Sequence, residues 1–193
     1  MAGSALLVMD VQRDVVDIVG VADSAGSGAG YLPRLRRAID GARAAGVPVI
    51  YVVMRLPAGD PRASARSKVM ATVVRAGLFA EGAPGTEIHP DVAPEPGEVV
   101  VAKRRASAFS GSDLDLVLRA RDIDHLVLAG IATSAVVLST ACRAIDLDLG
   151  LTVLADACLD TDPELHRVVT ENLFPLWGDV LSVDAWLAAI GSR

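Results

Sequence analysis

The sequence has few cysteines and few aromatic residues. Its two cysteines, Cys142 and Cys158, form no CxxC pair, so neither a disulfide framework nor a zinc knuckle is expected, and both are interpreted as buried thiols. Aromatic residues make up 4% of the 193 residues, whereas hydrophobic residues make up 52%. A core built mainly from Ala, Val, Leu and Ile fits helices packed on a buried sheet.

The sequence also lacks a surplus of basic residues and any long apolar run. Its formal net charge is -6, which disfavours a nucleic-acid partner because phosphate binding needs a concentrated basic face. No apolar run approaches the roughly 18 residues that cross a bilayer, and no charged segment precedes an apolar one as in a signal peptide. We therefore expect a cytoplasmic protein with neither a membrane nor a nucleic-acid partner.

The pattern along the chain predicts one α/β domain over residues 1–193, because a chain of this length can bury a single core. The predicted strands are residues 5–9, 47–53, 98–102, 125–129, 151–155 and 179–183. The predicted helices are residues 31–45, 67–76, 113–120 (capped by Ser112), 133–145, 163–173 and 186–190. Small residues predict a loop at 20–30, and residues 55–96 form the least regular segment.

Alternating strands and helices predict a six-stranded parallel sheet with right-handed crossovers and helices on both faces. In such sheets, ligands bind outside the carboxyl ends of the strands, near the point where the strand order reverses. The polar residues that follow the predicted strands are therefore the candidate functional residues.

Three strand ends carry such residues. Asp10 and Gln12 follow the first strand, Lys103 follows the third, and the turn at residues 130–135 follows the fourth. Lys103 is one of only two lysines in the chain. Taken singly, Asp10 fits a helix cap or a surface carboxylate as well as it fits a functional site, and Lys103 fits a solvated strand end. Together they can form an ion pair that positions Asp10 as a general acid or base.

The turn after the fourth strand has two interpretations. Backbone N–H groups at the start of a helix favour an oxyanion or a carboxylate, so the turn can serve as an oxyanion hole. It can equally be a plain helix start that is capped by Thr133 or Ser134.

Three strings of residues resemble the isochorismatase-like hydrolases, a family that includes nicotinamidases and related cysteine hydrolases. They are LLVMDVQ around Asp10, KRRASAFSGSDL from Lys103, and GIATSAVVLSTACRA from residue 130, and the likeness runs from about residue 5 to 182. The resemblance implies a Rossmann-like three-layer sandwich, a small-molecule substrate and a homo-oligomer.

The resemblance also implies an Asp, Lys and Cys triad, with a cis peptide bond just before Ala132 or Thr133. The Asp and the Lys correspond to Asp10 and Lys103, and the nucleophile corresponds to Val136. The residues expected to contact substrate are Gln12, Phe109, Ala132, Thr133 and Val136.

Val136 cannot be a nucleophile, because an alkyl side chain has no lone pair with which to attack. Cys142 lies six residues further along the same predicted helix, about 9 Å away in rise. Cys158 follows the fifth strand. Neither thiol is expected to take the place of the nucleophile.

The isochorismatases proper resemble this chain in the segment K-x-R-x-S-A-F, residues 103–109, and they too lack the cysteine. They hydrolyse a vinyl ether, a reaction that needs a carboxylic acid and no thiol. Asp10 can supply the proton if burial raises its pKa. Those enzymes carry Gly at the position of Val136, so the identity of the substrate does not carry over.

No metal or cofactor is expected. Nicotinamidases bind a metal through an Asp and histidines after the second strand, whereas residues 55–64 of this chain read RLPAGDPRAS and contain no histidine. His89, His125 and His166 are isolated from one another in the sequence. His166, in PELHRV, is typical of a helix end or a surface.

Three hypotheses remain open from the sequence. The first is a cofactor-free hydrolase with Asp10 as general acid or base, Lys103 as its electrostatic partner, and the turn at 132–136 donating hydrogen bonds to an ether or an ester-like substrate. The second is a non-catalytic member of the family that binds a small molecule or a partner. The third is an amidase that uses a displaced thiol.

Overall fold

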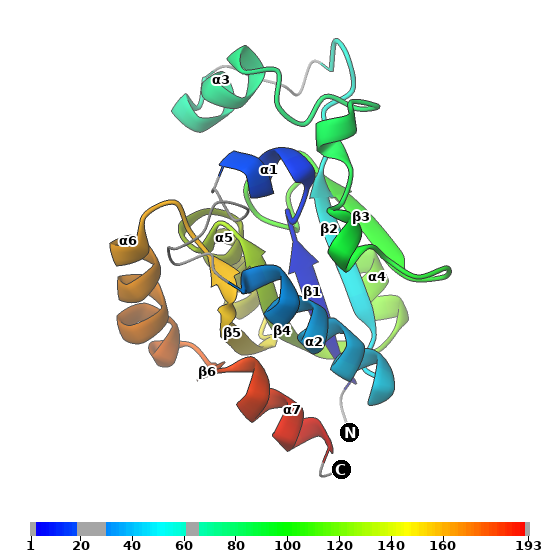
Figure 1. The fold of residues 1–193 in the computed structure, drawn as a ribbon, viewed down its shortest axis with the longest axis vertical. Helices are drawn as coiled ribbons and strands as arrows, with labels where there is room; N and C mark the ends of the chain where they lie inside the picture. Colours follow the sequence, from blue (N-terminus) through cyan, green and yellow to red (C-terminus); the bar gives the residue numbers. More distant parts are fainter. Residues whose placement is uncertain (1–2, 19–29, 61–65, 192–193) are drawn as a thin grey trace.

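The computed structural model describes residues 3–18, 30–60 and 66–191. At its centre lies a parallel six-stranded sheet in the order β3-β2-β1-β4-β5-β6 (Figure 1). The strands are β1 (Gly3–Met9), β2 (Val49–Met54), β3 (Val99–Lys103), β4 (Ile123–Ile131), β5 (Gly150–Leu159) and β6 (Asp179–Leu181). The strand order reverses between β1 and β4, where a parallel sheet opens a crevice for a ligand.

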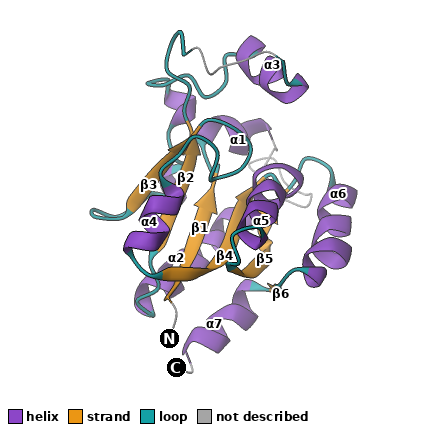
Figure 2. Ribbon diagram, turned by 180° about the vertical axis from the view of Figure 1, so that it is seen from behind, coloured by secondary structure: helices purple, strands orange, loops and turns teal. Residues whose placement is uncertain are grey.

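Helices cover both faces of the sheet, which confirms the predicted three-layer architecture. They are α1 (Arg13–Ile18), α2 (Tyr31–Ala44), α3 (Lys68–Arg75), α4 (Leu114–Ala120), α5 (Leu138–Ile145), α6 (Pro163–Val168) and α7 (Val183–Gly191). Figure 1 views the face with α2 and α7, and Figure 2 views the opposite face with α4 and α5. Alternate residues of β1 enter two separate apolar cores, Leu7 on the α4 and α5 side and Leu6 on the α2 and α7 side.

All six strands were predicted from the sequence, and the predicted and observed strands differ only in where they begin and end. The prediction that the last strand continues to Val183 is wrong, because Val183 already begins α7. The Ser182 hydroxyl accepts the Ala185 N–H at 3.1 Å and Asp156 accepts the Val183 N–H at 2.8 Å, so the chain turns into a helix there. The predicted loop at 20–30 lies, except for Gly30, outside the described residues.

Three helices also differ from prediction. Helix α1 is not predicted, because its six residues bury only Val16 and so leave almost no periodic signal. The helix predicted from residue 133 starts as a π-helical turn, η4 (Thr133–Val137), and continues as α5. In α4 the cap residue is Asp113, and the Ser112 hydroxyl accepts the Leu114 N–H at 3.4 Å.

The segment between β2 and β3 is irregular, as predicted, and carries α3 away from the sheet at the top of Figure 1. It has a small core of its own, made of Met54, Leu56, Met70 and Phe79. No helix in the described ranges combines the length and the apolar character that a membrane span requires.

Gly130 lies where β4 passes β1, and its φ is +145°. A Cβ atom at this position would lie 2.2 Å from the Met9 carbonyl oxygen. We expect Gly130→Ala to lower the free energy of unfolding by about 3 kcal/mol or more, because overpacking and backbone strain each cost about 1–3 kcal/mol. Urea unfolding measures the loss.

Gly46→Ala is the matched control for this substitution. Gly46 has a φ of +68°, and nothing lies within 4 Å of the added Cβ atom. The control therefore carries backbone strain without a clash and should cost about 1 kcal/mol. Equal losses in the two variants would show that the close approach to Met9 is not the cause.

Candidate active site

The side chains of Asp10 and Lys103 meet at the carboxyl edge of the sheet. Asp10 follows β1 and Lys103 ends β3, with β2 between them in the sheet. The Lys103 Nζ lies 2.7 Å from the Asp10 Oδ2. Asp10 is 7% exposed and Lys103 is 1% exposed. The two residues therefore form a buried ion pair that bridges the ends of two strands.

The Asp10 carboxyl has two features that suit proton transfer. Burial raises its pKa above the usual range, and the Lys103 ammonium opposes this through its charge and its hydrogen bond. The Oδ1 atom is buried and accepts no hydrogen bond from any residue that the structure describes. One carboxyl oxygen is thus bound to the lysine, and the other has no hydrogen-bond partner within the described part of the chain.

The backbone at Asp10 is also unusual. Its φ is +55°, in the left-handed region that Asp and Asn tolerate better than most residues. The Asp10 N–H donates to the Val52 carbonyl at 2.8 Å, and the Lys103 Nζ also donates to the Arg105 carbonyl at 3.0 Å. Both ends of the ion pair are therefore anchored to backbone atoms.

Gln12 is fully buried and bound to the backbone through its amide. Its Nε2 donates to the carbonyls of Met54 at 3.0 Å and Thr86 at 2.7 Å, and its Oε1 accepts the Met54 N–H at 2.9 Å. Both donor hydrogens are used in these bonds. The amide ties the segment after β1 to the end of β2 and to the insertion, next to the Asp10 carboxyl.

The turn after β4 contains three of the residues that the resemblance indicates. The peptide bond between Ile131 and Ala132 is cis. Ala132 is half-buried, Thr133 is fully buried and Val136 is 1% exposed. Val136 belongs to the apolar core that also contains Met9 and Ala108. The position that the resemblance assigns to a nucleophile is therefore an apolar contact.

Two side chains from the segment after β5 bind this turn. The Asp160 Oδ2 accepts the Ser134 N–H at 2.7 Å, and the Thr133 hydroxyl lies 2.8 Å from the His166 Nδ1. The Ser134 N–H is therefore not available to a substrate oxygen. Ala132 makes no side-chain cap bond at the helix start. The turn is capped by a distant carboxylate and not by Thr133 or Ser134.

Sequence reasoning missed these two residues. Asp160 follows β5 directly, so the rule that selected Asp10 at the end of β1 applies to it as well. His166 is on a helix, as predicted, but it is half-buried and hydrogen-bonded to Thr133.

Phe109 lies on the loop after Lys103 and packs against the core that contains Val136. The Ala108 N–H donates to the Thr140 hydroxyl at 2.9 Å, which ties this loop to α5. Phe109 and Val136 thus come from different elements and border the same apolar cluster.

Neither cysteine offers a thiolate at the turn. Burial is the main cause that raises the pKa of Cys158 to about 12, and Asp156 adds to the rise. The interpretation of both cysteines as buried thiols is correct for Cys158 but wrong for Cys142, which is exposed on α5. A thiol with such a high pKa is protonated at neutral pH and is a poor nucleophile.

The three histidines lie apart in the structure as they do in the sequence. His89 accepts the Asp91 N–H at 3.3 Å, His125 contacts Thr152, and His166 contacts Thr133. Across the described residues, no three His, Cys, Asp or Glu side chains gather in a way that could hold a metal ion.

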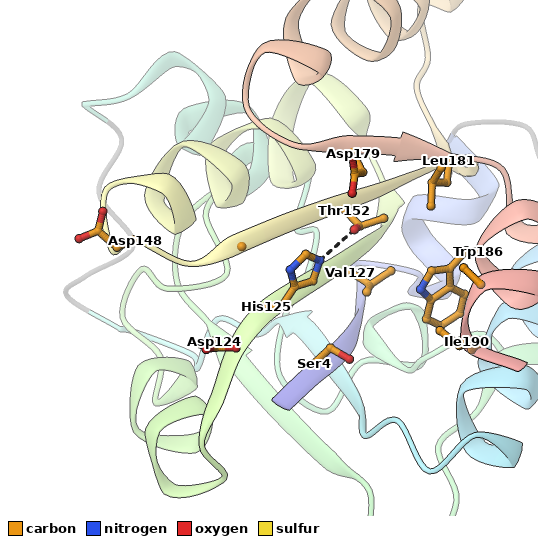
Figure 3. A pocket seen from close by; sticks show the side chains of 12 residues that line it. Ser4, Asp124, His125, Val127, Asp148, Thr152, Asp179, Leu181, Trp186 and Ile190 are labelled. Carbon is orange, nitrogen blue, oxygen red and sulfur yellow. Dashed lines mark hydrogen bonds between the residues drawn. The ribbon is translucent and has the colours of Figure 1, made fainter. Parts of the chain in front are cut away.

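A cavity of about 490 Å³ lies at the opposite edge of the sheet, where β4 and β5 begin (Figure 3). His125 and Thr152 lie side by side in its lining, with 2.9 Å between Nε2 and Oγ1, and Trp186 is another lining residue. None of the residues that resemble the family motifs lines this cavity. A smaller cavity of about 160 Å³ lies at the carboxyl end of β5, between Arg34, Cys158, Asp160 and His166.

Comparisons with known proteins agree with this geometry. The family model of the Isochorismatase domain matches residues 4–185. The ureidoacrylate amidohydrolase RutB of Methylobacterium radiotolerans is 35% identical over 207 residues, covering 98% of this chain and 80% of the relative.

Two solved structures are similar over nearly the whole chain. An isochorismatase family protein from Desulfovibrio vulgaris has a TM-score of 0.84 and 29% identity, with 100% of both chains covered. A cysteine hydrolase from Pseudomonas syringae pv. phaseolicola has a TM-score of 0.86 and 24% identity, covering 98% of this chain and 92% of that one.

Proposed function

Because this chain belongs to the isochorismatase-like hydrolase family, we propose that it hydrolyses a small molecule with Asp10 as general acid or base and Lys103 as its electrostatic partner. No covalent thiol intermediate takes part. The observation that carries the proposal is the buried ion pair at the carboxyl edge, in which the Asp10 Oδ1 has no partner among the described residues.

The position of the pair supports this role. The pair lies beside the reversal of strand order between β1 and β4, which is the favoured ligand site of a parallel sheet. A carboxyl with a raised pKa near a fixed cation can hold a proton or release it during turnover. The turn at 132–136 and Phe109 border the same region and supply contacts to the substrate.

Val136 determines which reactions are open to this site. Amide hydrolysis through an acyl-enzyme needs a nucleophile, and the valine offers none. The relative from Methylobacterium is named an amidohydrolase, but Val136 favours a substrate that reacts without covalent catalysis. Vinyl ethers and activated esters meet this condition better than amides.

A vinyl ether illustrates the proposed chemistry. The protonated Asp10 gives its proton to the enol carbon, and water adds to the resulting oxocarbenium carbon. The carboxylate takes back a proton from that water, and the hemiketal collapses to a carbonyl compound and an alcohol. Lys103 takes no part in these proton transfers and holds the carboxyl in place.

A small substrate panel tests the proposal. We expect isochorismate or p-nitrophenyl acetate to be turned over faster than ureidoacrylate, and the activity to persist in a Cys142→Ser/Cys158→Ala variant. Product formation measured by chromatography decides both points. Loss of activity in the cysteine variant, with its fold intact by circular dichroism, would favour the displaced thiol instead.

The second candidate function is binding without turnover. It is favoured by the purely apolar character of Val136 at the position that the resemblance assigns to the nucleophile. Thermal stabilisation by members of the panel, without product formation, would support it. Hydrolysis that disappears in Lys103→Ala would exclude it.

A further inference from the structure

The turn at 132–137 is held by two side chains outside the Asp10 and Lys103 pair. We propose that Asp160 and His166 are positioning residues, which fix this turn against the substrate through Ser134 and Thr133. The kinetic part of this inference rests on the proposed function, whereas its structural part does not.

Asp160 acts on the first turn of the helix after β4. Its side chain is buried, and Asp160 is only 4% exposed. One carboxylate oxygen accepts the Ser134 N–H at 2.7 Å, and the other lies 3.4 Å from the Thr161 hydroxyl. A carboxylate at a helix start satisfies a backbone donor and interacts favourably with the helix dipole. The backbone of the turn is thereby tied to the end of β5.

His166 acts on the neighbouring residue. Its Nδ1 lies 2.8 Å from the hydroxyl of Thr133, which is fully buried. The Thr170 hydroxyl donates to the His166 carbonyl at 2.8 Å, which anchors the histidine backbone on its own helical segment. Thr133 is one residue beyond Ala132 and three before Val136, so a shift of this hydroxyl moves the residues expected to contact substrate.

The two bonds support from outside a turn whose own backbone is closed by the N–H groups of Ala135 and Val137, both donating to the Ala132 carbonyl. Its cap residue, Ala132, has no polar side chain. Both supporting groups come from the segment after β5, at residues 160 and 166, and so hold consecutive residues of the turn from one side. A displacement of about 1 Å at a reacting centre can cost about 10²-fold in rate.

The His166 bond depends on its protonation state. Burial lowers the pKa of His166 below its ordinary 6.5, while Asp160 and Glu171 act in the opposite direction. Asp156 and Arg34 line the small cavity beside the ring, and Arg167 on the same helix pairs with Glu164 and Glu171. Burial therefore favours the neutral ring, and in the tautomer with its proton on Nε2 the Nδ1 atom accepts the Thr133 hydroxyl. Protonation turns both ring nitrogens into donors.

The test compares paired variants at two positions. His166→Leu removes the acceptor, whereas His166→Asn keeps one close to the Nδ1 position. Thr133→Val removes the hydroxyl, and Thr133→Ser keeps it. With a substrate from the panel, we expect His166→Leu and Thr133→Val to lower kcat about 10–100-fold with little change in KM. The conservative variants His166→Asn and Thr133→Ser should keep most of the wild-type kcat.

The pH profile separates positioning from a merely structural role. In the wild-type chain, kcat is expected to fall only once the pH drops through the lowered pKa of His166, below the range of an ordinary histidine, because the protonated ring no longer accepts the Thr133 hydroxyl. This limb of the profile should be absent from His166→Asn, which cannot titrate. An unchanged limb in that variant would overturn the role of His166.

A second measurement needs no substrate. Amide hydrogen exchange at Ser134 should be at least about 10-fold faster in Asp160→Asn, His166→Leu and Thr133→Val than in the wild-type chain, with Val52 in β2 as an unaffected control. If the wild-type chain turns over nothing in the panel, the proposed function fails, and this exchange still decides the positioning role. Unchanged exchange at Ser134 in all three variants would overturn it.

Discussion

Asp10→Asn is expected to lower kcat by about 10²–10⁴-fold on any substrate that the chain hydrolyses, because an amide cannot exchange a proton as a carboxyl does. Asn tolerates a φ of +55° and its Oδ1 can accept from the Lys103 Nζ, but the buried lysine loses its anion, so the variant is expected to be less stable and its fold is checked by circular dichroism. Steady-state kinetics measure the loss. Asp17→Asn, on the exposed face of α1, is the matched control and should keep full activity.

The pH dependence of this reaction identifies the role of Asp10. The pKa of Asp10 is raised in the folded chain, so its proton is held to higher pH than in an unfolded chain. If Asp10 is the general acid, kcat falls as the pH rises through that pKa; if it is the general base, kcat rises there. Activity in Asp10→Asn equal to that of the wild-type chain would contradict both roles.

The same raised pKa affects stability. The folded chain binds more protons than the unfolded chain between the two pKa values of Asp10, so ionisation of this group costs stability as the pH rises. The asparagine variant lacks this cost. Its free energy of unfolding should therefore decline less with pH than that of the wild-type chain over the same window.

Lys103→Met is expected to lower the free energy of unfolding by about 3–5 kcal/mol at pH 8, because it leaves the Asp10 carboxylate buried without its cation. The loss should be smaller at acidic pH, where Asp10 takes up a proton and becomes neutral. Urea unfolding at pH 5 and pH 8 measures both values.

Two further variants make this experiment decisive. Lys68→Met removes the only other lysine, which is exposed at the start of α3, and should change stability by less than about 0.5 kcal/mol. The double variant Asp10→Asn/Lys103→Met removes both charges and should recover much of the loss. A double variant as unstable as Lys103→Met alone would show that the unpaired carboxylate is not the cause.

The sequence predicted the residues at strand ends because apolar runs stop at them. Asp10 and Lys103 each follow such a run, and in a parallel sheet all carboxyl ends share one edge. The hydrogen bonds of Gln12 could not be predicted in this way, because they depend on which backbone groups of β2 and of the segment after it lie close to its amide in the folded chain. The contact of His166 with Thr133 was also unpredictable, since it arises from how α6 packs against the turn.

The helical segments show the same limit. Helix α2 was predicted almost to the residue, because five buried side chains recur along it at helical spacing. The π-helical turn at 133–137 has no signature in the sequence pattern, and the side chains that contact it, Asp160 and His166, come from a distant segment of the chain. Local patterns determine elements that bury one face, whereas turns held by distant side chains need the assembled fold.

The place of β3 at the edge of the sheet affects how firmly Lys103 is held beside Asp10. β3 is an edge strand that pairs only with β2, and it supplies the lysine, whereas β1 at the centre supplies the aspartate. Edge elements open more readily than central ones. Under the proposed function, a local opening of β3 would separate Lys103 from Asp10 and inactivate the site before the whole domain unfolds.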